Sequence, residues 1–386
     1  MADGRKRSAA KQARRDARRR KARREGAAER EALDEAPLID EVRQALDTGQ
    51  PLDLLVLVSM VVLATTPQPA MLRQPDEDDL ATLDELVAAF IGVDVPETTA
   101  LLAVLGEVLV DDDVLRDRCR RAVEARDETL PGWLAGLAQT SVHRAVRMTH
   151  VLGDGDELLF GVRLADGQEL SCAANIDHLM MSVLTDAFFV PEPIEKVLTV
   201  AKASNTDPDT SFVDLDLADA RAELQQALER HLTMYPLDES DTWPSCRPLL
   251  QWLIQLMPEG GSTALVLQQD STQIAELLER FFGSLVGMPF NDIDHRKLLE
   301  HCAEEGTGNP LRWSALRLRQ LLDAAFDYDD VPAEVQLDLT EMLRAFVPFA
   351  HAQSGIREEL TAEDLVAIDE VAGDYRAMVL EDEGPG

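Results

Sequence analysis

Cysteine is scarce in this chain of 386 residues, and its four cysteines lie far apart. None of them forms a Cys-x-x-Cys pair, so the common zinc and redox motifs are missing. The spacing also disfavours a disulfide framework of the kind found in small secreted proteins. We therefore expect reduced thiols and a cytoplasmic location.

A long hydrophobic run is missing too. The most apolar stretch, LDLLVLVSMVVLA at residues 52–64, is shorter than the roughly 20 residues that a membrane span needs. Several acids separate this run from the basic N-terminus, which disfavours a signal peptide. We expect a buried core helix here and no contact with a membrane.

Lysine is rare, since nearly all basic residues are arginine. Together with abundant alanine, leucine and aspartate, this is typical of a high-GC bacterial genome, and we favour an actinobacterial source. A haloarchaeal origin would also explain the acidity, but it explains the arginine-rich N-terminus less well.

The charge is unevenly divided along the chain. The net charge is −35, yet residues 5–24 hold twelve Lys or Arg and one acid, which leaves 25 bases against 71 acids elsewhere. That remainder, at −46, repels nucleic acid and anionic lipid. Any contact with RNA, DNA or a ribosome would have to be made by residues 5–24, within the segment 1–35 that we call the basic arm.

The basic arm has no apolar residue larger than alanine after Met1 until Leu33, so we expect it to be disordered when free. Its spacing favours a helix with a basic stripe once a partner is bound, and arginine contacts phosphate with two hydrogen bonds. An alternative is that the arm folds back on the chain's own acidic body. The candidate polyanion contacts are Arg7, Lys11, Arg14, Arg15, Arg18, Arg19, Lys21 and Arg23.

The remaining sequence predicts a mainly α fold with a small antiparallel β-meander near 150–176. Apolar residues follow a helical period from 36 to about 140, alternate between 157 and 176, and then return to a helical period. The turn-rich stretch 235–248 indicates a boundary. The predicted parts are the disordered arm at 1–35, a helical domain with the inserted meander at 36–235, a C-terminal helical domain at 236–380, and a frayed acidic tail at 381–386.

The register of the meander can be predicted as well. A two-residue Asp-Gly turn would place Leu164 opposite Glu169 and mix apolar with polar faces. A three-residue loop, Ala165 to Gly167 with Gly167 left-handed, pairs Val162 with Leu170 and Phe160 with Cys172. Because a slip of one residue moves every side chain to the opposite face, we predict the three-residue loop.

Local motifs for chemistry are weak, and we assign no catalytic, cofactor-binding or metal-binding residues. His295 and His301 are six residues apart, so they miss the helical i, i+4 pair of zinc sites. We interpret Asp294 and Asp177 as N-caps of helices, and the GDGD and PEGGST stretches as turns. The acids at 111–113 and 328–330 fit helix N-termini better than paired catalytic carboxylates.

Several stretches resemble a group of conserved actinobacterial proteins of unassigned function. They are GVRLADGQELSCAANIDH with the following DAFFVPEP, GNPLRWSALRLRQLL, and LRAFVPFAHAQSGIREELTAEDLVAIDE. The resemblance is patchy over about half of the chain. It implies a cytoplasmic protein and carries no site residue across.

Three functions remain in view. The sequence favours a non-enzymatic cytoplasmic binding or scaffold protein, whose acidic helical body engages an unknown protein partner while the arm adds electrostatic contact. The alternative is a nucleic-acid- or ribosome-associated factor that binds through the arm. An enzyme of unrecognised class is the third, because a site assembled from distant residues leaves no local motif.

Overall fold

The computed structural model describes residues 37–66, 81–233, 242–263, 271–323 and 331–382. Its internal contacts divide the chain into two units, residues 1–138 and 139–386. The division predicted from the sequence concerned separately folding domains, and it stays a prediction. The basic arm, with all eight of its candidate contact residues, lies outside the described residues.

The first unit is helical, as the sequence predicts. A helix over 37–48 ends just before Gly49, and the helix that follows Asp112 begins with that residue's carboxylate accepting the Leu115 N–H at 2.9 Å. The other helices are α2 (Pro51–Thr65), α3 (Leu83–Gly92), α4 (Pro96–Val108), α5 (Asp113–Glu124) and the short α6 (Gly132–Ala135).

The apolar run at 52–64 forms α2, with one side buried in the unit's core. Leu54, Leu55 and Val58 are buried there, whereas Met60 is half exposed. Among the described helices, none combines the length and the apolar character that a membrane span requires.

The second unit contains a five-stranded antiparallel sheet in the order β4-β3-β2-β1-β5. The predicted hairpin register is confirmed, because Val162 pairs with Leu170 and Phe160 with Cys172. Gly167 has a φ of +90°, as the three-residue loop requires. The strands are β1 (Ser141–His150), β2 (Gly155–Arg163), β3 (Glu169–Asp177), β4 (Val183–Val190) and β5 (Thr210–Leu215).

The sheet is larger than the meander predicted from the sequence. The stretch 177–190 was expected to be helical, and it instead forms a tight turn followed by β4. The stretch SNTDPDTS at 204–211 favours a loop by its composition, yet its last two residues begin β5 (Thr210–Leu215). β4 gains ladder hydrogen bonds from β3, the strand just before it, and β5 gains them from β1, which is distant in sequence. In both places strand pairing overrides local preference.

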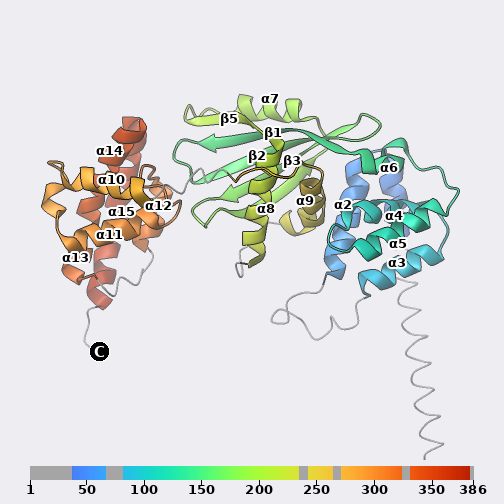
Figure 1. Ribbon diagram of the computed structural model, residues 1–386, viewed down its shortest axis with the longest axis horizontal. Coiled ribbons are helices and arrows are strands. Elements are labelled where there is room, and N and C mark those ends of the chain that lie inside the picture. The colour runs from blue at the N-terminus through green and yellow to red at the C-terminus, as the bar shows by residue number, and fades with distance from the viewer. Residues whose placement is uncertain (1–36, 67–80, 234–241, 264–270, 324–330, 383–386) are drawn as a thin grey trace, which may run out of the picture. The chain divides into compact units, whose positions relative to one another are not determined.

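Helices cover both faces of the sheet (Figure 1). Helix α7 (Ile194–Ser204) packs on one face through Ile194 and Leu198, against a row formed by Val146, Leu159 and Ala173. Helices α8 (Leu217–Thr233) and α9 (Trp243–Gln255) lie on the opposite face. The predicted helices in these segments are confirmed, except that α9 starts inside the stretch predicted to be a loop.

The C-terminal part is helical and has its own apolar core. Phe281, Phe346 and Trp313 are fully buried at its centre, with ring centroids of Phe281 and Phe346 4.9 Å apart. The helices are α10 (Ser271–Phe282), α11 (Ile293–Glu304), α12 (Ala315–Asp323), α13 (Ala333–Leu337), α14 (Leu339–Ser354) and α15 (Glu358–Asp382).

Two predicted N-caps are wrong. Helix α11 is capped by Asp292, whose carboxylate accepts the backbone N–H groups of Asp294 and His295. Asp177 caps no helix, because it ends β3 and accepts the Met180 N–H at 3.1 Å within the following turn. At the start of α11 the sequence offers two neighbouring acids, Asp292 and Asp294, and Asp177 is an acid at the end of a strand. In each case the path of the backbone decides which carboxylate oxygen accepts a free N–H.

Candidate functional site

A cavity of about 350 Å³ lies beside the end of the sheet where β3 turns into β4. One wall is formed by β2, β3 and the turn from β3 to β4, a second by α8, and a third by the end of α11 and the loop after it. The lining residues are Asp156, Ile176, His178, Leu179, Met181, Ser182, Glu223, Gln226, Ala227, Arg230, Thr263, Glu304, Glu305, Gly306, Thr307 and Gly308. This volume is in the range of small-molecule sites.

The inner wall of the cavity is a buried ion network. Arg147 Nε lies 3.2 Å from Asp156 Oδ2, and the same guanidinium is hydrogen-bonded to Glu223 of α8. His178 Nε2 also lies 3.2 Å from Asp156 Oδ2. Asp156, His178 and Arg147 are each less than 10% exposed. A single buried arginine thus holds two carboxylates in place at the cavity.

The sheet register brings this network together. Thr149 of β1 pairs with Asp156 of β2, and Arg147 stands two residues earlier on the same face of β1. His178 follows β3, whose Ile176 pairs with Asp156. Because side chains alternate across a strand, these groups point to the α8 side, where Glu223 meets them.

Burial and hydrogen bonding act in opposite directions on the two carboxylates. Burial alone would raise the pKa of Asp156, but hydrogen bonds from His178 and Thr149 and the charge of Arg147 hold that pKa below its ordinary value. Burial raises the pKa of Glu223, and the nearby Asp156 charge adds to the rise despite Arg147. Asp156 is therefore the fixed negative charge of the pair, and Glu223 is the one that gains a proton more readily.

The turn between β3 and β4 is held in an uncommon conformation. Met181 and Ser182 have φ values of 61° and 59°, in the left-handed region that residues other than glycine seldom adopt. Arg230 of α8 donates a hydrogen bond to the Met181 carbonyl at 2.9 Å, and the Asp154 carbonyl accepts the His178 N–H at 2.8 Å. These contacts fix the turn so that Ser182 Oγ lies 2.9 Å from His178 Nδ1.

The loop that forms the third wall is hydrogen-bonded to a side chain of the C-terminal helices. Arg317 of α12 is buried and donates hydrogen bonds to the Glu305 carbonyl at 2.7 Å and the Asn309 carbonyl at 2.6 Å. It also donates to the Thr307 hydroxyl at 3.2 Å. Burial lowers the pKa of Arg317 to about 10, so it stays charged at neutral pH. The loop that closes the cavity is therefore shaped around one internal cation.

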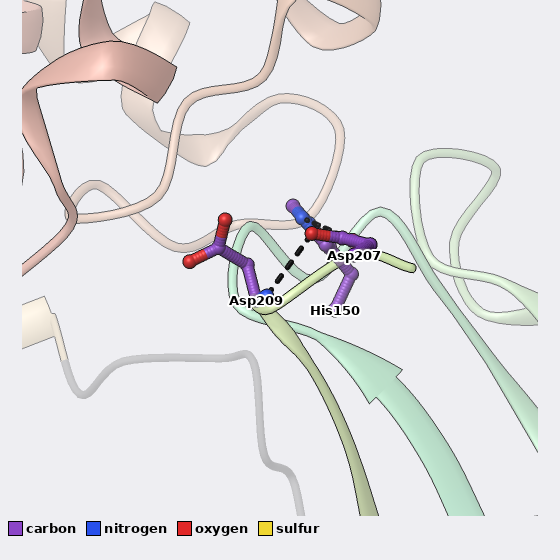
Figure 2. Close-up of side chains that lie close together, drawn as sticks. All are labelled: His150, Asp207 and Asp209. Atoms are coloured by element: carbon purple, nitrogen blue, oxygen red, sulfur yellow. Dashed lines mark hydrogen bonds and ion pairs between the residues drawn. The ribbon is translucent and has the colours of Figure 1, made fainter. Parts of the chain in front are cut away.

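A second cluster of side chains with metal-binding atoms lies where β1 ends and β5 begins. His150, Asp207 and Asp209 each offer one such atom within 4.8 Å of the others. Figure 2 shows the His150 ring facing the Asp207 carboxylate, which also accepts the backbone N–H of Asp209.

The hydrogen bonds of this cluster are made within the protein. The Leu152 N–H donates to His150 Nδ1 at 3.2 Å, which leaves the ring proton on Nε2, 3.3 Å from Asp207 Oδ2. Arg357 Nε donates to Asp209 Oδ2 at 2.6 Å. Backbone and hydroxyl donors, with Asp209 N–H and Thr210 first among them, lower the pKa of Asp207. The arrangement ties the strand ends to the start of α15 through ion pairs.

Two further histidines lie apart from both clusters. His295 contacts Asp292 at 2.6 Å and Asp338 at 3.3 Å, and it is an interhelical contact of α11. His143 lies on β1, a strand, and its Nε2 is 3.9 Å from Glu169. The acids at 111–113 belong to the N-terminus of α5, as expected, while those at 328–330 lie outside the described residues.

Sequence reasoning missed the residues of the cavity. Asp156 stands in the GDGD stretch that we interpreted as a turn, and His178 and Ser182 stand in a stretch predicted to be helical. A signal was present, because VLTDAFFV is rich in β-branched and aromatic residues and follows a strand directly. Arg147 and Glu223 have no local signal, since they are 76 residues apart.

Comparisons of the chain with protein-family models, with curated proteins and with solved structures find no match.

Proposed function

We propose that the protein binds a small organic molecule carrying an amine or another cationic group, in the cavity beside α8. The observation that carries this proposal is the charge of the lining. Four carboxylates face Arg230 and His178, and the further arginine behind the wall, Arg147, is already paired. The lining therefore has an excess of negative charge, and such a cleft raises the local concentration of cations.

The interior of the cavity offers an anchor for such a group. Asp156 Oδ2 is shared by Arg147 and His178, whereas Asp156 Oδ1 is buried without a hydrogen-bond partner. A buried carboxylate oxygen left unpaired costs free energy, and an ammonium group that enters beside it recovers that cost. Ile176, Leu179 and Ala227 supply the apolar wall for the hydrocarbon part of the ligand.

The same charge argues against phosphate-bearing ligands in this cavity. Glu304 and Glu305 are exposed at the loop after α11, so an approaching polyanion meets two negative charges first. Selectivity for amines over carboxylates of equal size is the expected consequence.

Calorimetry with 1,4-diaminobutane, butylamine, butyrate and butanol tests the proposal. We expect the two amines to bind and butyrate and butanol to fail. Glu223→Gln should weaken amine binding about tenfold, as expected for one charged hydrogen bond. Glu229→Gln is the matched control on the same helix, because Glu229 is exposed and contacts Gln225. Equal titration curves for butylamine and butyrate would refute the proposal.

A second candidate function is protein binding, as favoured by the sequence, and one surface supports it. Leu285 and Ile293 are 89% and 79% exposed, and Val286 and Met288 between them are more than half exposed. Apolar side chains gathered in one short stretch typically mark a protein contact. The basic arm would add electrostatic contact, and the counter-charge that it meets is either a nucleic acid or the chain's own acidic body.

The full chain and a chain lacking residues 1–30 distinguish these ligands. Filter binding with RNA and with DNA at two salt concentrations should show arm-dependent, salt-sensitive retention if the arm binds nucleic acid. Sedimentation of both chains at the same two salt concentrations reports self-association. Leu285→Asp with Ile293→Asp should reduce self-association if the apolar stretch is the contact, while exposed Val114→Asp on α5 serves as control.

A further inference from the structure

Ser182 and His178 are placed as a serine nucleophile and its general base are placed in acyl-transfer enzymes. The Ser182 Oγ to His178 Nδ1 distance is 2.9 Å, within the hydrogen-bond range that proton transfer requires. Both side chains line the cavity, so a bound molecule can reach the hydroxyl. The two residues are four positions apart in the turn from β3 to β4. Because that turn reverses the chain, it brings the two atoms together.

The two residues before β4 have the positive φ angles that the central positions of a type I′ hairpin turn require. Met181 and Ser182 are both left-handed and neither is glycine, which costs free energy at each residue. Met181 is 66% exposed, so its side chain contributes little to any core. The turn directs the Ser182 hydroxyl at the imidazole.

Asp156 lies beside the other nitrogen of the His178 ring. His178 Nε2 lies 3.2 Å from Asp156 Oδ2, and Arg147 fixes that carboxylate from behind. His178 Nε2 lies within ion-pair distance of Asp156 but makes no hydrogen bond there. In the tautomer whose proton is on Nε2, Nδ1 accepts the serine proton. In the best-known serine hydrolases Nε2 of the histidine faces the serine and Nδ1 faces the aspartate, whereas here Nδ1 faces the serine and Nε2 the aspartate. The chemistry requires only that one nitrogen accepts a proton and the other carries one.

We propose that Ser182 is a covalent nucleophile that cleaves small esters bearing an amine, with His178 as general base and Asp156 as positioning residue. The inference rests on the proposed function, because the amine-binding cavity is the one onto which Ser182 opens. Ser182 Oγ forms a bond to the ester carbonyl carbon while His178 Nδ1 takes the hydroxyl proton. The bond to the alcohol oxygen breaks, and the alcohol leaves with that proton. Water then attacks the acyl-serine, which releases the acid and restores the hydroxyl.

Arg230 is the cation of the lining that can stabilise the developing negative charge. It lines the same cavity and is held by its hydrogen bond to the Met181 carbonyl, one residue before the nucleophile. A fixed cation near the attacked carbonyl stabilises the transition state more than the ground state.

A fluorophosphonate probe tests the nucleophile on the full-length chain. The serine oxygen displaces fluoride from phosphorus, and peptide mass spectrometry then locates the label. We expect the label on Ser182 of the native protein and its loss after denaturation. Labelling that is absent from Ser182, or no faster there than at Ser284, would overturn the proposal. Ser284 is a matched comparison, since it is half-buried and donates to the Phe281 carbonyl with no imidazole beside it.

Variants separate the roles of the other two residues. His178→Gln should slow labelling about a hundredfold or more, the usual worth of a general base. Asp156→Asn should slow it as well, and Asp156→Glu should restore part of the rate, which a merely structural role would not show. Melting temperatures identify any variant that fails to fold, and mapping the label on the native chain needs no variant.

The outcome distinguishes the two proposals. Ser182→Ala should abolish labelling, whereas Glu229→Gln, outside the cavity on α8, should leave both labelling and calorimetric binding of 1,4-diaminobutane unchanged. Amine binding without Ser182 labelling would refute only the nucleophile, whereas labelling without amine binding would refute only the amine ligand.

Discussion

The guanidinium of Arg317 stacks on the indole of Trp313, with its central carbon 4.0 Å from the ring centroid. Trp313 donates its own ring N–H to the Pro310 carbonyl at 2.9 Å, so the pair fixes the loop on both sides. The loop 304–308 that closes the cavity is therefore linked to the core of the C-terminal helices. A substitution that lowers the stability of that core should therefore also change the shape of the cavity.

Replacing Arg317 tests this link. Arg317→Ala leaves several buried carbonyls without donors, and we expect the free energy of unfolding to fall by about 3 kcal/mol or more. Urea unfolding measures the change. Arg319→Ala on the same helix is the control, because Arg319 pairs with Glu370 at the surface and should cost about 1 kcal/mol or less. Equal losses for the two variants would contradict the structural role of Arg317.

Asp364 predicts a pH dependence of stability. Burial raises its pKa from 3.8 to about 7 in the folded chain. The folded state then keeps a proton that the unfolded chain has lost, so stability falls as pH rises from about 4 to 7 and stays low above that. We expect Asp364→Asn to unfold at higher denaturant than the native chain at pH 8, and the gap to close toward pH 4.

His351 contributes the opposite slope and must be separated from it. Burial lowers the pKa of His351 from 6.5 to about 4, so this group withdraws stability as pH falls from about 6.5 to 4. His351 Nδ1 lies 3.9 Å from Asp364 Oδ2, so the two groups are coupled and the Asp364→Asn comparison is repeated in a His351→Gln background. A gap between the two chains that is constant across pH would show that Asp364 is not the titrating group.

Proton release on binding follows from Glu223. Burial raises the pKa of Glu223 above its ordinary 4.5, and an ammonium group bound beside it should lower that pKa again. Diamine binding in mildly acidic solution should therefore release protons. Calorimetry in two buffers of different ionisation enthalpy measures the number released, and Glu223→Gln should bring it close to zero. An unchanged proton count in that variant would assign the release to another group.

Zinc should not stabilise the chain through the cluster in Figure 2. His150 Nε2 carries a proton toward Asp207, and Asp209 is engaged by Arg357, so a metal would have to break these contacts. We expect equal melting temperatures with equimolar Zn²⁺ and with a chelator. A rise with Zn²⁺ that His150→Gln removes would show that the three residues do bind the metal.

The sequence predicted most helices and the central hairpin because these features depend on neighbours along the chain. Capping at Thr82, the stop at Gly92 and the left-handed Gly167 all use contacts within a few residues. Strand β5 was missed because its partner is distant, since His150 of β1 pairs with Thr210, 60 residues later. Strand β4 pairs with the preceding β3, and its β-branched and aromatic residues were a local signal that the helical prediction overlooked.

By itself, the sequence determined the charge of the protein, its mainly helical character and the register of one hairpin, since composition and short-range periodicity fix these. Only the tertiary structure decided the candidate site. The residues at Arg147, Asp156, His178, Ser182 and Glu223 have ordinary local surroundings in the sequence. Strand pairing and the docking of α8 place the last four of them around one cavity, with Arg147 paired behind its wall. Because these side chains are removed from water, the electrostatic interactions among them are stronger than those between exposed side chains.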